Sequence, residues 1–370
     1  AYAEVGSDTD ISPFSGVLNY QINSKMFQGP LSVQPMANIN TNTIPNPHLR
    51  PMRLKEREVG LNVMMFDRVN MELVYYSKLS IDQILNAAVS NTSSYSSTRV
   101  NVGESRTSGF EAFIDLMAVQ GTNFRWNFGL NGTYITSKVL KLGESDEDVS
   151  IGGSVRHIVG QPMAQMYRSG YLRDEQGRKI FNPNNGLPLA TPQAIYLGET
   201  LPKWIGGFTN TFNYRGLEFY ALIDFKLGHK VYQNNNFDNV RHGKHKKTLV
   251  GRDVGYVIGD GVLPDGSPNT IQVPIQPYYE ADAQIQEGHV ANGGFWKLRQ
   301  VSLGYDFTSL VSAYLPVQGL SFNVIVNNVY TFKKWTENMD PEQMSSPNSD
   351  TISYALPLSR SFGFNLKVEI

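Results

Sequence analysis

The last fifteen residues, LPLSRSFGFNLKVEI (356–370), decide how the rest of the chain is interpreted. From Phe362 to Ile370 every second residue is apolar, and the residues between them are small, polar or charged. Successive side chains of a strand point to opposite faces, so the stretch predicts a strand with one apolar and one polar face. Half-buried strands of soluble sheets and strands of membrane barrels both show this pattern. Because it continues to the last residue, where an edge must be paired, we favour a closed barrel.

The composition narrows the class of protein. The formal net charge is -1 and charged residues make up 18% of the chain, so no general positive field predicts nucleic-acid binding. Cysteine is absent, which excludes disulfides and thiolate metal sites. No apolar run approaches the roughly 18 to 20 residues that a spanning helix needs. A membrane protein made of strands remains possible, because barrel strands alternate apolar with polar residues.

Four pairs of alternating runs predict four β-hairpins. These pairs are 59–65 with 69–75, 110–116 with 124–134, 204–214 with 217–227, and 301–307 with 320–326. Minimal turns at Asp67-Arg68 and Arg215-Gly216 join the first and third pairs, as expected of hairpins. The run 124–134 is about as long as a tilted strand that crosses a bilayer.

Short and long connections alternate along the chain. We expect loops at 6–53, 86–106, 143–202, 228–294 and 333–355, with small strands around 164–173. Outer-membrane barrels have short periplasmic turns and long extracellular loops, whereas a soluble sandwich has no reason to sort its connections in this way.

Aromatic residues gather at both ends of the predicted strands. Those near the short turns are Phe124, Trp126, Phe212, Tyr214, Tyr305 and Phe307, and those near the long loops are Phe110, Tyr134, Trp204 and Phe225. This distribution predicts the two interfacial girdles of a barrel; the alternative is the aromatic core of a soluble β-domain. With a short strand at Ala1 to Val5, the runs make about ten strands. Because the chain starts in mid-strand, we expect a C-terminal piece of a longer protein, or a processed product.

Several short motifs follow one another in a fixed order. They are NVGE (101–104) with GFE (109–111), PKW (202–204) with GGF (206–208), GHKVY (228–232), FWKLRQVSLGY (295–305), NNVYTFKKW (327–335) with MDPE (339–342), and LPLSRSF (356–362). Together they resemble the C-terminal half of the barrel of SusC/RagA-like TonB-dependent outer-membrane transporters. Two positions depart from the family: Ser359 replaces a usual proline, and Ile370 stands where such barrels usually end in an aromatic residue.

This resemblance implies an all-β fold, a transmembrane antiparallel β-barrel of 22 strands with long extracellular loops. Residues 1–370 would supply about ten C-terminal strands, and nothing in them resembles the plug or the TonB-contacting segment. The family lies in the Gram-negative outer membrane and imports glycans or peptides with a SusD-like surface lipoprotein, driven through TonB. We expect no enzyme activity and no cofactor. Two alternatives are a siderophore-type receptor and a structural barrel of a surface or secretion complex.

Aromatic and amide side chains of the long loops are candidates for substrate contacts, because rings stack on sugars and amides form hydrogen bonds. The candidates are Tyr167, Tyr171, Tyr232, Asn234, Asn235 and Trp335. Their alternative role is to order their own loops. No nucleophile elbow, phosphate loop or zinc helix appears, so we expect no catalytic or metal-ligating residues.

Two further motifs have competing interpretations. The run HGKHKK (242–247) is the densest in charge and suits a metal, an anionic substrate or a solvated loop tip. We favour the solvated tip, because no carboxylate lies at ligand spacing. The run DGVLPDG (260–266) superficially suggests calcium, but it lacks the spaced ligands of a calcium loop and is interpreted as a turn.

Overall fold

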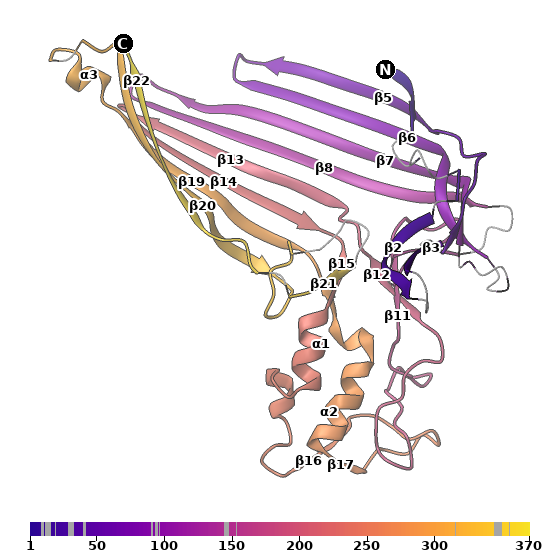
Figure 1. The fold of residues 1–370 in the computed structure, drawn as a ribbon. Helices are drawn as coiled ribbons and strands as arrows, with labels where there is room; N and C mark the ends of the chain where they lie inside the picture. The colour runs from indigo at the N-terminus through magenta and orange to yellow at the C-terminus, as the bar shows by residue number, and fades with distance from the viewer. Residues whose placement is uncertain are drawn as a thin grey trace.

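One large antiparallel sheet dominates the computed structural model (Figure 1). The structure describes residues 1–8, 11, 16–18, 20–28, 33–39, 42–89, 92, 95, 97–143, 148–152, 154–314, 316–343, 350–354 and 356–370. The main path of the sheet runs in the order β1 (Tyr2–Ser7), β5 (Met52–Met65), β6 (Val69–Ala88), β7 (Ser97–Gln120), β8 (Phe124–Leu142), β13 (Trp204–Tyr214), β14 (Leu217–Leu227), β19 (Phe295–Asp306), β20 (Gly319–Lys334) and β22 (Ser361–Glu369). The short strand β4 (Thr43–Ile44) adds to β7 in parallel.

All four predicted hairpins are confirmed, as β5–β6, β7–β8, β13–β14 and β19–β20. In the turn between β13 and β14, Arg215 and Gly216 have φ values of 48° and 86°. Two positive φ values match the right-handed twist of the flanking strands, so the turn holds the register of the hairpin. The fourth hairpin has a longer connection that contains the short helix α3 (Thr308–Val311).

The apolar residues of neighbouring strands form continuous rows across one face of the sheet. Phe208 pairs with Leu130 on β8 and with Ile223 on β14, and Ile223 pairs in turn with Leu298 on β19. Side chains on this face are exposed on the outer strands of the sheet. On β5, for example, the Val59 side chain is 74% exposed. An apolar surface this wide is rarely left to water, and it matches the lipid-facing band of a barrel.

The opposite face is polar, so the predicted alternation and the antiparallel sheet are confirmed. One row across it contains Asn131, Gly207, Asp224 and Lys297. Adjacent residues of each strand therefore lie on opposite faces, one in the apolar rows and the next in polar rows that suit a water-filled lumen.

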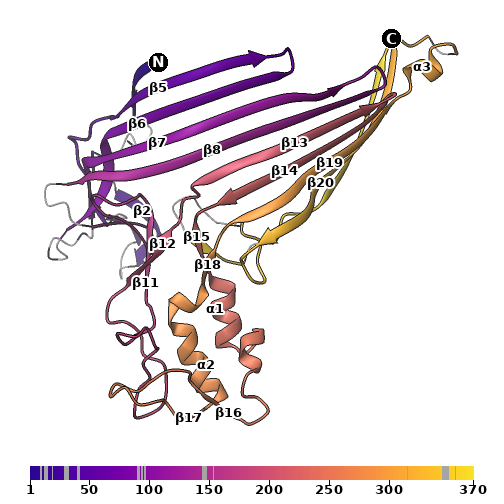
Figure 2. The same cartoon turned by 180° about the vertical axis from the view of Figure 1, so that it is seen from behind.

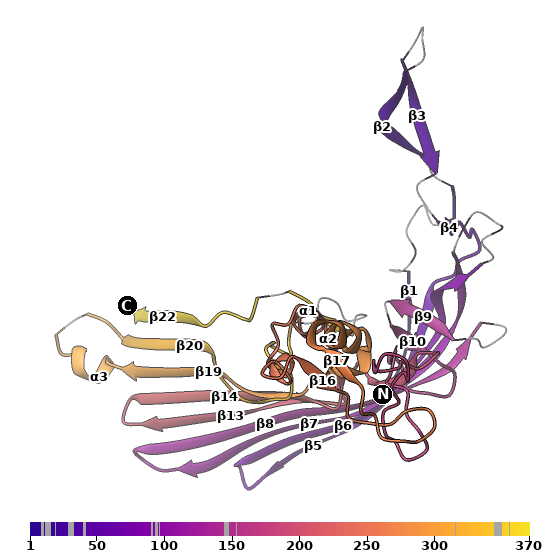
Figure 3. The same ribbon diagram turned by 90° about the horizontal axis from the view of Figure 1, so that it is seen from below.

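Two of the predicted loops are wrong in extent. β6 continues to Ala88 and β7 begins at Ser97, so most of the predicted loop 86–106 is strand. The Ser- and Thr-rich sequence of these strand ends lacks apolar alternation, which is why it predicted a loop. The predicted loop 6–53 contains a hairpin of β2 (Tyr20–Gln28) and β3 (Val33–Ile39), which projects away from the sheet (Figure 3).

The loops predicted at 143–202 and 228–294 fold together into an extension beyond the long-loop end of the sheet (Figures 1 and 2). Its first part contains β9 (Val149–Gly152), β10 (Val155–His157), β11 (Gln165–Arg168) and β12 (Ile195–Glu199), which form a sheet in the order β12-β11-β10-β9. Strand β11 confirms the small strands expected around 164–173.

The second part of the extension contains the helices. Its elements are β15 (Lys230–Gln233), α1 (Asn234–Arg241), η2 (Lys246–Leu249), β16 (Tyr256–Ile258), β17 (Gln272–Pro274), α2 (Ile275–Gln284), η3 (Gln286–His289) and β18 (Val290–Asn292); β21 (Thr351–Ile352) joins β15 from the last loop. Helices α1 and α2 pack around Val240, Val257, Tyr279 and Ala283. No helix in the described ranges is long and apolar enough to cross a membrane.

Phe208 and Thr209 are adjacent on β13 and face opposite sides of the sheet, so they test which side contacts lipid. In the complete barrel, Phe208→Lys should lower the free energy of folding into lipid vesicles by about 2–4 kcal/mol, because it places a charge in the apolar band. Thr209→Lys should have a small effect. Urea titration with a heat-modifiability assay measures both, and equal losses would contradict the assignment of the two faces.

Candidate functional site

A buried ion pair joins the last long loop to the extension. The Arg168 guanidinium donates hydrogen bonds of 2.9 and 2.7 Å to the two carboxylate oxygens of Asp350, and the two side chains are only 6% and 2% exposed. The same guanidinium lies 3.7 Å from the centre of the Tyr232 ring on β15. The pair therefore ties β11, β15 and the residues around Asp350 to one another.

A second ionic cluster ties the same loop to the polar face of the barrel sheet. Lys297 on β19 donates to Asp340 at 2.7 Å and to Glu342 at 2.6 Å, and Arg299 donates to Glu342 and Asp224, each at 2.7 Å. Burial opposes ionisation of Glu342, but the hydrogen bonds from Arg299 and Lys297 hold its pKa below the usual value. The MDPE motif thus anchors the last loop to the lumen side of the sheet.

We call the region of β11, β12, β15 and β18, where the extension joins the barrel sheet, the neck. Two hollows open in it, on either side of a pair of tyrosines. The rings of Tyr167 on β11 and Tyr196 on β12 lie 5.9 Å apart. The hollow on the Tyr167 side has a volume of about 330 Å³ and includes Arg156, whose guanidinium lies 5.3 Å from the Tyr167 ring centre.

The hollow on the Tyr196 side has a volume of about 250 Å³ and contains a buried histidine. His229 is 5% exposed, and its Nδ1 has no hydrogen-bond partner among the described residues. Burial, and secondarily the charge of Lys226, lower the pKa of His229 to about 4, so the imidazole is neutral at physiological pH. Lys203 forms an ion pair with Glu199 at 2.9 Å on the wall of this hollow.

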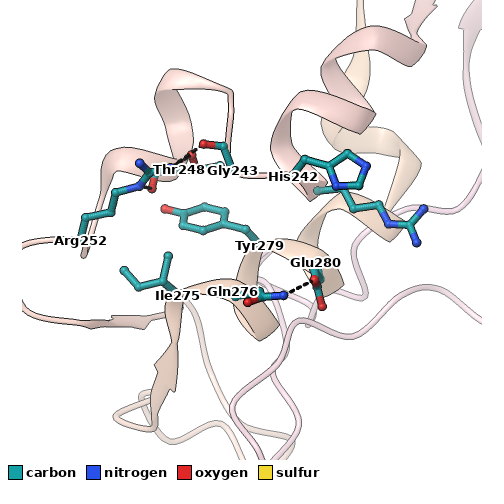
Figure 4. Close-up of a pocket in the computed structure, with 9 residues that line it drawn as sticks. His242, Gly243, Thr248, Arg252, Ile275, Gln276, Tyr279 and Glu280 are labelled. Carbon is teal, nitrogen blue, oxygen red and sulfur yellow. Dashed lines mark hydrogen bonds between the residues drawn. The ribbon is translucent and has the colours of Figure 1, made fainter.

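A third hollow, of about 560 Å³, lies at the far end of the extension (Figure 4). The Tyr279 ring lies in its middle, with His242 and Glu280 on one side and Arg252 on the other (Figure 4). The Arg252 guanidinium is already hydrogen-bonded to Thr248: Nη2 donates to Oγ1 at 2.9 Å, and Nε donates to the backbone carbonyl at 2.8 Å. Its lining residues belong to the end of α1, to η2 and the residues after it, and to the start of α2, which lie in the extension away from the barrel sheet (Figure 1).

The basic run 242–247 is not a solvated loop tip throughout, which corrects the sequence interpretation. His245 is 8% exposed, and its Nδ1 accepts a hydrogen bond from the backbone N–H of Lys247. Lys246 pairs with Glu337 at 2.9 Å, and Lys247 pairs with the buried Asp282. These carboxylates are distant in sequence, so the spacing rule could not detect them. Within the described ranges, no group of three or more potential metal ligands is assembled.

The run 260–266 is a turn in the structure. The backbone N–H of Gly266 donates to the carbonyl of Leu263 at 2.9 Å, and Asp265 accepts from the N–H of Ser267 at 2.9 Å. Both contacts are ordinary turn chemistry, as the sequence predicts.

The six predicted contact residues fall into different environments. Tyr171 is 5% exposed and donates to Asp282 at 2.8 Å; burial and this carboxylate raise its pKa. Tyr232 is 4% exposed beneath Arg168, and burial raises its pKa to about 12 despite that positive charge. Asn234 and Asn235 begin α1, where Asn235 accepts from the N–H of Tyr354 at 2.8 Å.

The remaining two candidates expose more of their side chains. Tyr167 is half-buried in the neck, and Trp335, just after β20, is 41% exposed. Sequence analysis missed Tyr196 and His229 as candidates. The GHKVY motif, which includes His229, was the sequence signal that could have identified this residue. Tyr196 had no such signal, because its pairing with Tyr167 depends on the fold of a loop.

The buried Arg168–Asp350 pair can be tested against an exposed pair. Asp350→Asn leaves the buried guanidinium without its counter-charge and should cost about 3–5 kcal/mol of local stability. Hydrogen exchange at β11 and at residues 350–354 measures the loss. The control is Arg178→Gln, which removes an exposed ion pair with Asp174 and should leave exchange unchanged. Equal effects of the two variants would show that the buried pair does not hold the loop.

Three buried histidines predict that the extension loosens in acid. Burial is the largest cause of the lowered pKa of His157, His229 and His289. A histidine with a lowered native pKa takes up protons first in the unfolded state, so stability is full above about pH 6.5 and falls as the pH drops toward 4. For His229 the loss is on the order of 3 kcal/mol.

Protease sensitivity of residues 143–202 and 228–294 between pH 7 and pH 4.5 measures this effect. Sensitivity should rise as the pH falls, and His229→Gln should weaken the dependence because it removes one of the three groups. A pH-independent digestion pattern in the unaltered protein would refute the prediction.

Comparison with known proteins assigns the family. The family model described as TonB dependent receptor-like, beta-barrel matches residues 17–329. TonB-dependent receptor P26 of Formosa agariphila is 29% identical over 212 residues, covering 50% of this chain and 21% of that protein. TonB-dependent receptor P39 of the same organism is 22% identical over 374 residues, covering 84% of this chain and 35% of that protein.

Solved structures show the same fold. The RagAB peptide importer in its closed-closed state matches with a TM-score of 0.76 at 18% identity, over 99% of this chain and 40% of that chain. Its open-open state gives 0.76 at 17% identity, over 100% and 39%. This chain therefore spans less than half the length of the proteins that it matches. Since the family model covers most of the chain, the chain belongs to the TonB-dependent receptor-like β-barrel family.

Proposed function

We propose that the chain forms part of an outer-membrane barrel that imports oligomeric nutrients, glycans or peptides, with energy supplied through TonB. The observation that carries the proposal is the hollowed neck, which lies at the long-loop end of a sheet with a polar inner face (Figure 1). A solute bound at the neck would enter the barrel at that end. The family comprises receptors and transporters rather than enzymes, and we propose no catalytic activity.

In this proposal residues 1–370 supply the C-terminal part of the barrel wall and its extracellular loops. The plug, the N-terminal strands and the TonB contact are assigned to parts outside these residues, in the same protein or on another chain. The polar inner face would line the path that opens when the plug moves.

We further propose a SusD-like surface lipoprotein as the partner of the extension. Support comes from apolar side chains at its far end: Leu249, Val250, Val254 and Ile258 are 44–65% exposed. Exposed apolar groups clustered in this way are typical of protein contacts. The fold shared with a peptide importer named RagAB is consistent with such an assembly.

Among the six predicted residues, Tyr167 and Trp335 suit substrate contact best, because their rings are partly exposed. Tyr171 and Tyr232 would instead fix the shape of the site, since both are buried and held by Asp282 and Arg168. Asn234 and Asn235, half-buried at the start of α1, remain candidates for hydrogen bonds to substrate.

Uptake by intact cells tests the import function. Deletion of the full-length gene and inactivation of TonB should each abolish growth on the oligomer that the system takes up, while growth on its monomer continues. The full-length gene should restore growth only when TonB is active. Growth on oligomers without TonB would contradict the proposal, and co-purification with secretion components and no uptake would favour the structural alternative. Loss of ferric-siderophore uptake alone would favour a siderophore receptor.

A further inference from the structure

The connection between β19 and β20 differs in composition from the other connections at the short-turn end of the sheet. Residues 67–68 are Asp-Arg, residues 120–123 are Gln-Gly-Thr-Asn and residues 215–216 are Arg-Gly. Residues 307–318, FTSLVSAYLPVQ, include no charged residue and no histidine, and more than half of them are apolar. A turn in water has no physical reason to exclude charge over this length, so its composition points to apolar surroundings.

The first part of this connection is helical and has one apolar side. The backbone N–H groups of Leu310 and Val311 donate to the carbonyl of Phe307 at 2.8 and 3.1 Å, and the N–H of Tyr314 donates to the carbonyl of Val311 at 2.9 Å. These four residues are spaced i, i+3, i+4 and i+7, which places them on one side of a helix. We call them the apolar stripe. The residues on the opposite side are threonine and serine, at positions 308, 309 and 312.

The apolar stripe is exposed, and it continues the apolar face of the sheet. Leu310 is 57% exposed and Tyr314 is 85% exposed. At the other end of the stripe, the ring centre of Phe307 lies 4.8 Å from that of Tyr305. Tyr305 pairs with Phe322 on β20, in a row of the face that matches the lipid-facing band of a barrel. The stripe therefore begins where that face ends.

Hydrogen bonds to the barrel sheet hold this short helix in place. The N–H of Phe307 donates to the carbonyl of Leu320 at 2.8 Å, and the N–H of Leu320 donates to Oγ1 of Thr308 at 3.0 Å. Asp306 accepts from the N–H of Thr308 at 2.8 Å. A helix this short is not stable alone, so these bonds to the sheet determine its position. It lies at the short-turn end of the sheet, opposite the extension (Figures 1 and 3).

We propose that residues 307–314 are an interfacial anchor, whose apolar stripe lies in the phospholipid surface of the periplasmic leaflet. An interfacial helix buries its apolar side roughly 5–10 Å into the boundary between headgroups and acyl chains. Tyr314 suits this depth, because its ring is apolar and its hydroxyl group reaches the headgroups. The anchor fixes the depth of the β19–β20 hairpin in the membrane. This inference rests on the proposed position of the barrel in the outer membrane and is independent of the substrate.

The test places nitroxide spin labels on the complete transporter in phospholipid vesicles. Residues 1–370 contain no cysteine, so Leu310→Cys and Tyr314→Cys can be labelled singly once any cysteine elsewhere in the protein is replaced. Power saturation compares access of oxygen, which concentrates in lipid, with access of a nickel chelate, which stays in water. The ratio of oxygen to nickel access should be several-fold higher at these two positions than at Ser309→Cys and Ser312→Cys. These serines are exposed on the opposite side of the helix and are the matched controls.

A label at Phe364→Cys on β22 reports on the barrel wall, because Phe364 is 71% exposed and stacks on Phe322. Heat modifiability confirms that each labelled variant is folded. Equal ratios at all four helix positions, with the Phe364 label in lipid, would refute the anchor and leave the membrane barrel standing. Labels at Leu310 and Tyr314 that neither reagent reaches would also refute it, since protein would then cover the stripe. A Phe364 label in water would instead refute the proposed membrane position, and the anchor with it.

Discussion

The buried pair of Arg168 and Asp350 is the interaction on which the arrangement of the extension depends. It joins residues 182 positions apart in sequence, and it brings together β11, the strand pair β15–β21 and the Tyr232 ring. An unpaired charge at either position would be buried at high cost, so the two segments hold each other in place. Through the Lys297–Asp340–Glu342 cluster the same loop is also fixed to the barrel sheet. The neck and its two hollows keep their shape because one loop is bound to both of its neighbours.

The barrel sheet follows a simpler constraint. Side chains alternate along each strand, and neighbouring strands are paired so that apolar residues lie opposite apolar residues. The aligned apolar residues of all strands together form one face of the sheet. One exception is Asn210, which pairs with Phe128 on the apolar face and accepts a hydrogen bond of 3.2 Å from Nε1 of Trp126. The aromatic residues predicted at the short turns contact one another across strands, as with Trp126 and Phe212, whose ring centres lie 5.6 Å apart.

Sequence patterns predicted the sheet well and the extension poorly, for a physical reason. The strand from Trp204 to Tyr214 has the bounds that the alternation predicts, because its faces meet two different environments. Helix α1 begins with three asparagines, which are poor helix formers, and it is stabilised by packing of Val240 against α2. The role of His245 was also hidden, because its partner Glu337 lies on another loop. Local sequence cannot reveal contacts of this kind.

The sequence by itself determined the strand order, the hairpins, the two faces of the sheet and, through ordered motifs, the family. Each of these depends on neighbours in the chain or on the period of two along a strand. Tertiary structure alone decided that the long loops form a packed extension, that Tyr171 and Tyr232 are buried in it, and that Tyr196 and His229 share a hollow. These features arise from ion pairs and packing between segments far apart in the chain, which leave no periodic signal. The terminal strand belongs to the first group: β22 pairs with β20 along its length, and its apolar face continues that of the sheet.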